Sequence, residues 1–417
     1  MAKIRAISAR EILDSRGNPT IEATVWLDSG HTGLASVPSG SSVGKTEAVE
    51  LRDGDLSRFN GLGVLKAVAN INELIGPKIK GLEASAQTKL DQLLIDLDGT
   101  PNKRNLGGNT TLAVSTAVLK ASAASFNLPV YQYLVKKYAL VKKVSQIPTP
   151  TFNIINGGKH GAGNLDFQEF HIVPSARFGF KDSLRIGDEI YKLLGKVLKN
   201  RQAIHSIGDE GGYAPNLFTN LDALEIIMET INQTSYGFAK DVFVGLDTAS
   251  DFFYKNGHYQ IKDRAQPFNR EELIAYYETL QRQYRLFSLE DGLEEEDWEG
   301  WQQLTERLGG QTLIVGDDLL TTNLKRVKTA ISKKACNAIL VKPNQIGTIS
   351  ETIEVIKLCR SVGWKVIVSH RSGETNDTFI ADFAVGVGAD YTKFGAPARG
   401  ERVAKYNRLL AIESQLT

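Results

Sequence analysis

From about residue 150 onward, eight short apolar runs alternate with longer stretches of helical period. This alternation limits the possible folds more than any other feature of the sequence. The runs are FNIIN, FQEFHIV, FVGLD, FSLED, LIVGD, AILVK, VIVSH and YTKFG. Strands that alternate with helices indicate an α/β fold with a largely parallel sheet. Eight such units in roughly 270 residues are close to the usual size of a (β/α)8 barrel. An open, doubly wound sheet would give a similar pattern, and the count of eight favours the barrel.

The first 140 residues are organised differently. Three alternating stretches within the first 60 residues, separated by the turn signals RGNP and DSGH, predict a small antiparallel meander. Helical patterns follow at 62–75, 85–94 and 110–126. The segment 142–150 has no period and contains two prolines, which is typical of a boundary. We therefore expect an α+β domain over residues 1–140 and a catalytic barrel over residues 141–417.

The composition argues against several classes of protein. Lys and Arg number 49 and Asp and Glu number 48, so a formal net charge of +1 gives no sign of nucleic acid or an anionic membrane as the main partner. Two cysteines support neither a disulfide framework nor a cysteine zinc site. The N-terminal stretch is interrupted by charges, and the sequence contains no apolar run of about 18 residues. We expect a cytoplasmic protein.

Six successive strand candidates, from the third onward, end in a chemically active side chain. These residues are Asp247, Glu290, Asp317, Lys342, His370 and Lys393. In a parallel barrel the carboxyl ends of the strands form one rim, so the six side chains are expected to converge. Any one of them alone could be a turn residue or a helix cap. Six in succession predict an active site.

The three acids of this series predict a metal ion. Asp247, Glu290 and Asp317 would repel one another at adjacent strand ends unless a cation lay between them. Oxygen ligands without cysteine or paired histidine indicate Mg²⁺ or Mn²⁺ rather than zinc. Asp291 and Asp318 directly follow two of these acids, so a shift of one residue in the ligand assignment stays open. We prefer Glu290 and Asp317 because they complete the apolar runs.

Basic residues at the same rim predict an anionic ligand. A metal that faces Lys342, Lys393 and the His370–Ser372 cluster needs a polyanion between them. Arg371 with the adjacent Ser372 hydroxyl suits a phosphate, because guanidinium offers a planar fork of donors. Arg371 could instead simply pair with Glu374.

Three upstream loops carry further candidate residues. The segment NGGKHGAGNLDFQEF contains His160, Gln168 and Glu169, and SIGDEGGYAPN contains Glu210 among three glycines that permit close backbone approach. The segment VPSGSSVGKTEA, which begins at Val37, is a Ser/Gly loop that leads into a helix start, and this is typical of a lid.

The order of these residues along the sequence resembles that of the enolase family, and the resemblance covers nearly the whole chain. The motifs that carry the resemblance are DSRGNPT, VPSG, LRDGD, DGTPNK, INGGKH, QEF, GDEGGYAPN, VGDDL, KPNQIGT, SHRSGET and KFGAPARGER with the nearby AKYN. The resemblance implies an N-terminal α+β domain, a barrel with an irregular, antiparallel second strand, and a homodimer. It also implies the reversible dehydration of 2-phosphoglycerate to phosphoenolpyruvate in glycolysis and gluconeogenesis.

The resemblance also implies roles for single residues. Lys342 would remove the C2 proton, and Glu210 would protonate the departing hydroxide with Glu169 beside it. Two Mg²⁺ ions would be bound per site, with Mn²⁺ as a possible substitute, the first held by Asp247, Glu290 and Asp317 and the second reached by Ser39. The substrate would be contacted by Gln168, Lys342, His370, Arg371, Ser372, Lys393 and, from a closing loop, His160.

This chemistry requires shifted pKa values. We expect burial, the metals and Lys393 to lower the pKa of Lys342, and Glu169 to raise the pKa of Glu210. Ser41 and Val43 depart from the residues more usual in the family, and their effect on the loop is open.

Two other functions are weighed against this one. A relative that acts on a non-phosphorylated carboxylate is disfavoured by Arg371, Ser372 and the Ser39 loop. A non-catalytic binding protein on the same barrel would be expected to lose Lys342 or a metal acid, and this chain keeps them all.

Overall fold

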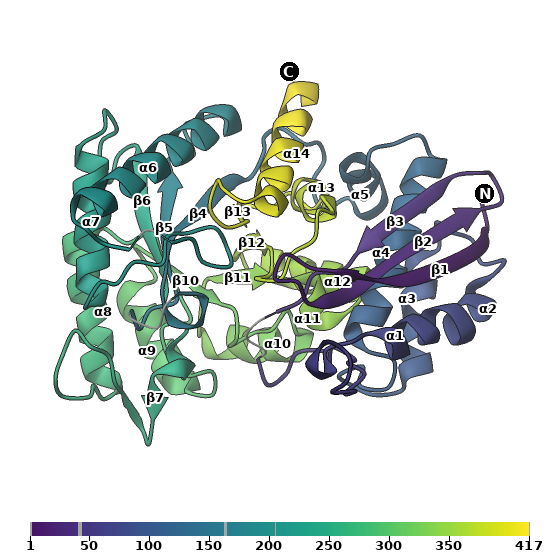
Figure 1. Ribbon diagram of the computed structural model, residues 1–417, viewed down its shortest axis with the longest axis horizontal. Coiled ribbons are helices and arrows are strands. Elements are labelled where there is room, and N and C mark those ends of the chain that lie inside the picture. The colour runs from purple at the N-terminus through teal and green to yellow at the C-terminus, as the bar shows by residue number, and fades with distance from the viewer. Residues whose placement is uncertain (1, 41–43, 162–164, 205, 417) are drawn as a thin grey trace.

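Two parts make up the fold, a small sheet with its helices and a closed barrel, and they lie side by side (Figure 1). The computed structural model describes residues 2–40, 44–161, 165–204 and 206–416. The N-terminal part begins with an antiparallel sheet of β1 (Ile4–Leu13), β2 (Pro19–Leu27) and β3 (Thr32–Ser36), in that order. The predicted meander is therefore confirmed.

Helices complete the N-terminal part. They are η1 (Phe59–Gly61), α1 (Leu65–Ala69), the π-helical turn η2 (Asn70–Ile75), α2 (Gly76–Ile79), α3 (Gln87–Asp98), α4 (Gly108–Ser125) and α5 (Val130–Tyr138). The long helix α4 is buried along most of its length because it packs on β2 and β3. Gly33 in β3 permits this close approach, since an added Cβ would lie 2.2 Å from the carbonyl oxygen of Ala117.

The second part is a closed barrel in which each of the eight predicted apolar runs forms a strand. The strands are β4 (Thr149–Asn156), β5 (Glu169–Pro174), β6 (Val242–Asp247), β9 (Ser288–Glu290), β10 (Leu313–Gly316), β11 (Ala338–Val341), β12 (Lys365–Ser369) and β13 (Tyr391–Lys393). Around the barrel they follow the order β10-β11-β12-β13-β4-β5-β6-β9. The barrel, rather than the open sheet, is thus confirmed.

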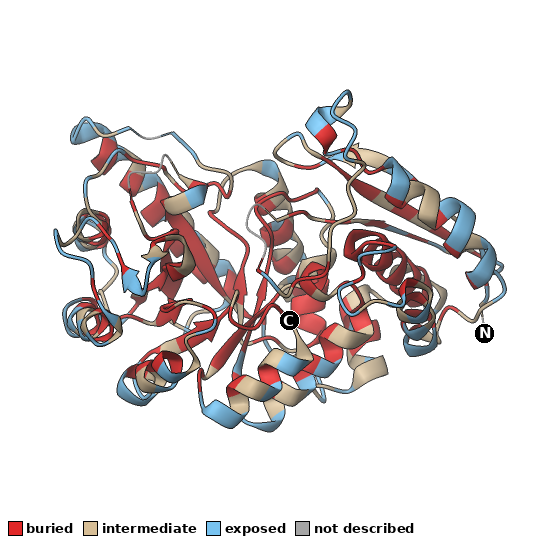
Figure 2. Ribbon diagram, turned by 90° about the horizontal axis from the view of Figure 1, so that it is seen from below, coloured by how far each residue is buried: buried red, intermediate tan, exposed pale blue. Residues whose placement is uncertain are grey.

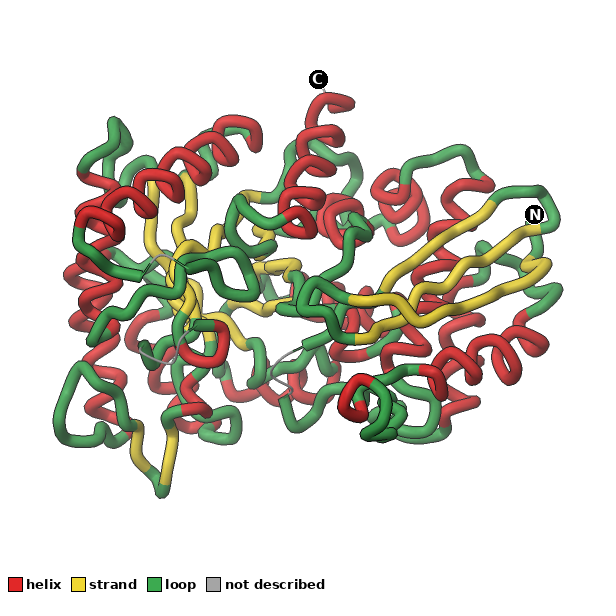
Figure 3. Tube along the Cα trace, in the orientation of Figure 1, coloured by secondary structure: helices red, strands yellow, loops and turns green. Residues whose placement is uncertain are grey.

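Helices surround the barrel (Figure 3). They are α6 (Phe180–Asn200), α7 (Asn220–Asn232), α8 (Arg270–Tyr284), α9 (Trp298–Leu308), α10 (Leu324–Lys333), α11 (Pro343–Ile346), α12 (Ile349–Ser361), α13 (Phe379–Gly386) and α14 (Gly400–Leu416). Short 3-10 turns η3 (Gly158–His160) and η4 (Ser250–Phe252) and the hairpin β7 (Tyr254–Lys255) and β8 (His258–Tyr259) lie in the connections. Buried residues fill the interior, and exposed ones lie on the outer helices (Figure 2).

Polar caps fix where several of these helices begin. Asn269 accepts the backbone N–H of Glu272 at the start of α8, and the Glu272 carboxylate accepts the N–H of Asn269 in return. Asn323 and Thr348 cap α10 and α12 in the same general way. Such caps satisfy backbone N–H groups that have no partner within the helix. Asn269, Asn323 and Thr348 therefore help to fix where α8, α10 and α12 begin.

The direction of β5 decides which residues reach the rim. β5 is antiparallel to both β4 and β6, whereas the other neighbouring pairs of the barrel are parallel. The residue that starts β5, Glu169, is therefore paired with Asp247 at the end of β6, and Asp247 is paired with Glu290 at the end of β9. The irregular second strand thus adds Glu169 to a rim otherwise made of strand ends.

The expectations for the two cysteines and for membrane-spanning segments can be compared with the fold. Cys336 and Cys359 are buried free thiols. Within the described ranges, no helix has the length and apolar character needed to span a bilayer.

Candidate active site

A small polar cavity lies at the rim of the barrel. Its lining residues are His160, Gln168, Glu169, Glu210, Asp247, Lys342, Ser369, His370, Arg371, Ser372 and Lys393. All but Ser369 belong to the predicted site. The other three predicted residues, Ser39, Glu290 and Asp317, are buried but do not line this cavity.

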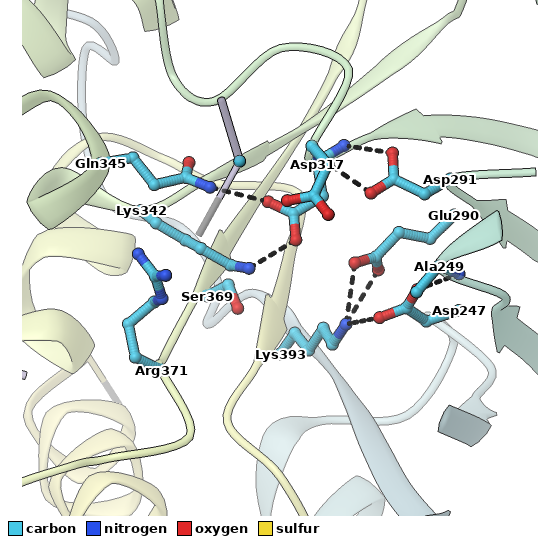
Figure 4. A network of polar contacts seen from close by, with 12 residues as sticks. Asp247, Ala249, Glu290, Asp291, Asp317, Lys342, Gln345, Ser369, Arg371 and Lys393 are labelled. Atoms are coloured by element: carbon cyan, nitrogen blue, oxygen red, sulfur yellow. Dashed lines mark hydrogen bonds and ion pairs between the residues drawn. The ribbon is translucent and has the colours of Figure 1, made fainter. Parts of the chain in front are cut away.

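Lys393 lies at the centre of a carboxylate cluster. Its Nζ is 3.0 Å from Asp247 Oδ2 and 2.9 Å from Glu290 Oε1 (Figure 4). The same Nζ is 3.0 Å from Glu169 Oε2. Burial lowers the pKa of Lys393, but the surrounding carboxylates outweigh burial and hold it well above its usual range. Lys393 therefore supplies the positive charge that these acids require.

Lys342 has a comparable partner in Asp317. Its Nζ lies 2.5 Å from Asp317 Oδ2, and Asp317 Oδ1 accepts a hydrogen bond of 3.0 Å from Gln345 (Figure 4). Burial lowers the pKa of Lys342, but the Asp317 carboxylate outweighs burial, so this pKa is raised. The direction is opposite to the one expected from the sequence, because Asp317 contacts the ammonium directly.

The acids of β6, β9 and β10 suit a hard cation. Burial first, and then the charge of Asp247, hold the pKa of Glu290 well above its usual range, which reflects like charges in close contact. The donors are all carboxylate oxygens, and protonated lysines neutralise them in this structure. Oxygen donors of this kind fit Mg²⁺ or Mn²⁺, so the residues present fit the expected group.

The tightest acidic triples are not the predicted one. In the described part of the chain, the triples with ligand atoms within 4.8 Å of one another are His160, Glu169 and Glu210, and Asp291, Asp317 and Asp318. Asp247, Glu290 and Asp317 do not form such a triple, because Lys393 and Lys342 separate their carboxylates.

The alternative ligand Asp291 has a structural role. Its Oδ1 accepts the backbone N–H of Asp317 at 3.0 Å, and its Oδ2 accepts that of Asp318 at 2.8 Å. The carboxylate of Asp291 therefore shapes the turn that follows β10. The preference for Glu290 over Asp291 as the ligand stays a prediction.

Histidines surround the two glutamates on the other side of the cavity. His171 Nε2 lies 2.7 Å from Glu169 Oε2, and His160 Nδ1 lies 3.3 Å from Glu169 Oε1. Glu210 contacts His160 Nδ1 through Oε1 at 3.6 Å and His370 Nε2 through Oε2 at 3.2 Å.

These histidines reverse the expected pKa shift of Glu210. Burial and Glu169 raise the pKa of Glu210, as the sequence predicted, but His160 and His370 outweigh both and lower it. The prediction considered one neighbour and missed the imidazoles. His171 was missed altogether, although it lies two residues after Glu169 on a strand and hence on the same face.

Arg371 is oriented by contacts from other elements. Its Nη1 donates to Glu47 Oε2 and to Asn344 Oδ1, both at 3.0 Å. Glu374 accepts the backbone N–H of Arg371 at 3.2 Å, while its carboxylate pairs with Lys405 at 2.9 Å. The guanidinium is thus not engaged in the simple pair with Glu374 that the sequence left open.

Two uncharged site residues carry buried polar atoms. Ser372 Oγ and Gln168 Oε1 have no hydrogen-bond partner among the described residues. A buried polar atom without a partner costs free energy unless a ligand or water satisfies it. Both atoms belong to residues predicted to contact substrate, and both residues line the cavity.

Ser39 lies where the N-terminal part meets the rim. Its backbone pairs with that of Gly373, and its hydroxyl donates to Glu50 and accepts from Arg52, both at 2.9 Å. The hydroxyl is therefore held by N-terminal residues. The divergent Ser41 and Val43 lie outside the described residues.

Two family models match this chain. The enolase N-terminal domain matches residues 4–134, and the enolase C-terminal TIM barrel domain matches residues 144–417. This chain belongs to the enolase family. The matched enolase domains span nearly all of it and agree with the observed small sheet and eight-stranded barrel. Enolase-type dehydration of a small molecule in a metal-dependent site is the chemistry that this membership supports.

Proposed function

We propose that this protein catalyses the reversible dehydration of 2-phosphoglycerate to phosphoenolpyruvate, the enolase step of glycolysis and gluconeogenesis. The observation that carries the proposal is the placement of a lysine opposite a pair of glutamates across one polar cavity. β11, which Lys342 follows, and β5, which Glu169 begins, are four places apart in the ring of eight strands, so they face each other across the barrel. Glu210 joins Glu169 through their shared neighbour His160.

Each side of the cavity, that of Lys342 and that of Glu169 and Glu210, carries out one proton transfer in the proposed reaction. Lys342 removes the proton from C2, and Glu210 protonates the hydroxyl that leaves from C3. The pKa of Glu210 is lowered in the protein without substrate, so this role requires the negative charge of the bound substrate to raise it. In this structure the Asp317 carboxylate raises the pKa of Lys342. If Asp317 bound a metal ion instead, this effect would be removed and Lys342 could accept a proton. Mg²⁺ held by Asp247, Glu290 and Asp317 would supply positive charge next to the substrate carboxylate, where negative charge develops.

The remaining side chains bind and orient the substrate. Arg371 and Ser372 suit the phosphate, and this phosphate site argues against a non-phosphorylated substrate. Gln168, His370, Lys393 and His160 close the cavity around the reacting carbons. With Glu47 and Asn344 fixing Arg371, the guanidinium is held in place before substrate arrives.

Several properties complete the proposal. We infer two Mg²⁺ per site, with Ser39 near the second, and Mn²⁺ as a substitute. We also infer a cytoplasmic homodimer with an N-terminal domain over residues 1–140, a catalytic barrel over 141–417, and neither nucleic acid nor a membrane as main partner. Size-exclusion chromatography with light scattering tests the dimer, and isothermal titration calorimetry with Mg²⁺ tests the number of ions.

A direct assay tests the proposed reaction. 2-Phosphoglycerate is added to the purified protein with and without Mg²⁺, and the absorbance band of phosphoenolpyruvate is followed. We expect a rise that requires Mg²⁺ and is absent in Lys342→Ala. A flat trace from protein that is folded by circular dichroism, with Mg²⁺ present, would contradict the proposal.

A further inference from the structure

A fully buried arginine in α14 lies behind the acid side of the cavity. Arg402 has no exposed surface. Its guanidinium donates to the backbone carbonyls of Arg371 at 2.6 Å, Ser372 at 2.5 Å and Asp209 at 3.0 Å. Arg402 thus joins the loop that carries Glu210 to the loop that follows β12. The sequence contained it within the KFGAPARGER motif but gave it no role.

The same guanidinium sets the position of the proton on His370. Arg402 Nη1 lies 2.8 Å from His370 Nδ1. Arginine remains charged in proteins and has only donors, so Nδ1 must be the acceptor. A neutral ring that accepts at Nδ1 carries its proton on Nε2.

The surroundings of His370 keep the ring neutral. Burial and the charge of Arg402 lower the pKa of His370 to about 4, although Glu210 and the more distant Glu374 act in the opposite direction. At pH 7 the imidazole is therefore uncharged. Its Nε2 lies 3.2 Å from Glu210 Oε2 without a hydrogen bond between them.

Glu210 Oε2 is approached by an amide donor as well. Asn153 Nδ2 donates to the same oxygen at 3.1 Å. Oε2 therefore has one hydrogen-bond donor, Asn153, and the Nε2 of His370 close by. The other oxygen, Oε1, lies 3.6 Å from His160 Nδ1. A proton carried by Glu210 is therefore directed to Oε1.

Close backbone packing maintains this arrangement. Gly395 has a φ of +84°, and an added Cβ would lie 2.5 Å from the Glu210 carbonyl oxygen and 2.9 Å from His370 Cε1. The next residue, Ala396, donates its N–H to the same Glu210 carbonyl at 3.0 Å, and the Tyr406 hydroxyl of α14 donates to the Gly395 carbonyl at 2.6 Å. Glu210 and His370 are thus packed around one glycine that tolerates no side chain.

We propose that Arg402 is a positioning residue that fixes the Nε2–H tautomer of His370, so that this N–H lies beside the Asn153-bound Oε2 of Glu210 and the acid proton is delivered from Oε1. In the dehydration direction, the C3–O bond breaks with its electron pair going to oxygen, which takes the Oε1 proton and leaves as water. The remaining Glu210 carboxylate is stabilised by the Asn153 amide, which donates to Oε2, and by the nearby N–H of His370. The delivery step rests on the proposed function, whereas the tautomer is a property of the protein without substrate.

Nitrogen NMR on the full chain tests the tautomer. Histidine labelled with ¹⁵N in the ring is incorporated, and two-bond ¹H–¹⁵N correlations are recorded at pH 7 without substrate. The chain has six histidines, and His370→Gln identifies the signal of His370 by its loss. We expect an unprotonated Nδ1 and a protonated Nε2. A proton on Nδ1, or on both nitrogens, would overturn the proposal.

A matched pair of variants tests the role of Arg402. Arg402→Lys removes the guanidinium with its several N–H donors. The control, Arg408→Lys, makes the same change on the same helix at an arginine that pairs with Asp382. We expect the Nε2–H signature to be lost in the first variant and kept in the second. We also expect dehydration in Arg402→Lys to fall about 100-fold while exchange of the C2 proton changes by less than about threefold. Equal losses of exchange and dehydration would reduce Arg402 to a structural role and contradict the proposal.

The outcomes separate this inference from the proposed function. Wild-type protein that shows the expected tautomer but no dehydration leaves the positioning by Arg402 intact and contradicts the function. Active wild-type protein with the other tautomer contradicts the positioning alone. Should Arg402→Lys fail to fold, the wild-type spectrum still decides the question.

Discussion

The two walls of the cavity neutralise their carboxylates in different ways. On one wall, Asp247, Glu290 and Asp317 contact the ammonium groups of Lys393 and Lys342, which end long side chains with several rotatable bonds. On the other wall, Glu169 and Glu210 contact imidazoles, and Glu169 also contacts the ammonium of Lys393. Of these, His370 is held by Arg402 and by close backbone packing.

This difference indicates a division of labour. A lysine can withdraw from a carboxylate by rotating its own side chain, so the first wall is suited to exchanging one cation for another. On the second wall His370 is held by Arg402 and by close backbone packing, so this side is suited to holding a proton at one atom. The predictions below are ways to break or sharpen this contrast, from the largest expected effect to the smallest.

Removal of the lysine base should have the largest effect. Lys342→Ala is expected to lower both exchange of the C2 proton and formation of phosphoenolpyruvate by about 10⁴-fold, because no other group would accept the proton. Deuterium exchange followed by NMR and the absorbance assay measure the two steps. The control is Lys357→Ala on the exposed face of α12. Exchange that survives in Lys342→Ala would mean that another residue is the base.

The increase in protein stability on adding Mg²⁺ should depend on the wall that carries Asp247. A cation that binds only the folded protein stabilises it by about 2.7 kcal/mol at a hundred times its Kd. We expect Mg²⁺ to raise the melting temperature of the wild type and to have little effect on Asp247→Asn. The control is the exposed Glu354→Gln in α12, which should respond like the wild type. An equal Mg²⁺ response in Asp247→Asn would exclude this wall as the metal site.

Acid should destabilise the histidine wall. The pKa of His370 is lowered to about 4 in the folded protein, below the ordinary value of about 6.5, because the neutral ring is buried. Between these values the unfolded chain binds a proton that the folded one does not, so His370 reduces stability as the pH falls from about 6.5 to about 4. The loss is about 3 kcal/mol.

Urea unfolding at a series of pH values measures this effect. The stability of His370→Gln should depend less on pH within that window than the stability of the wild type. Parallel profiles for the two proteins would show that His370 is not a buried neutral imidazole.

Much of the fold was predictable because it depends on local patterns. The eight apolar runs identified every barrel strand, and the polar residues at the ends of six of them predicted the rim. The reversed direction of β5 left no trace in the period, because an apolar run reads alike in either direction. Only the resemblance to the enolase family implied it.

The electrostatics of the site could not be predicted in the same way. The pKa shifts of Lys342 and Glu210 depend on Asp317, His160 and His370, which meet them through space from distant parts of the chain. Sequence order gives no distance between such groups. Arg402 was missed for the same reason, since its partners lie about 30 residues upstream or further.

The central claim is that Lys342 and Glu210 act separately from opposite walls. The most direct test is the ratio of C2 exchange to dehydration in Glu210→Gln, measured in deuterated buffer with Mg²⁺ and 2-phosphoglycerate. The account predicts that exchange persists near the wild-type rate while dehydration falls about 10³-fold. Loss of exchange together with dehydration would contradict it, because the base would then depend on the acid wall.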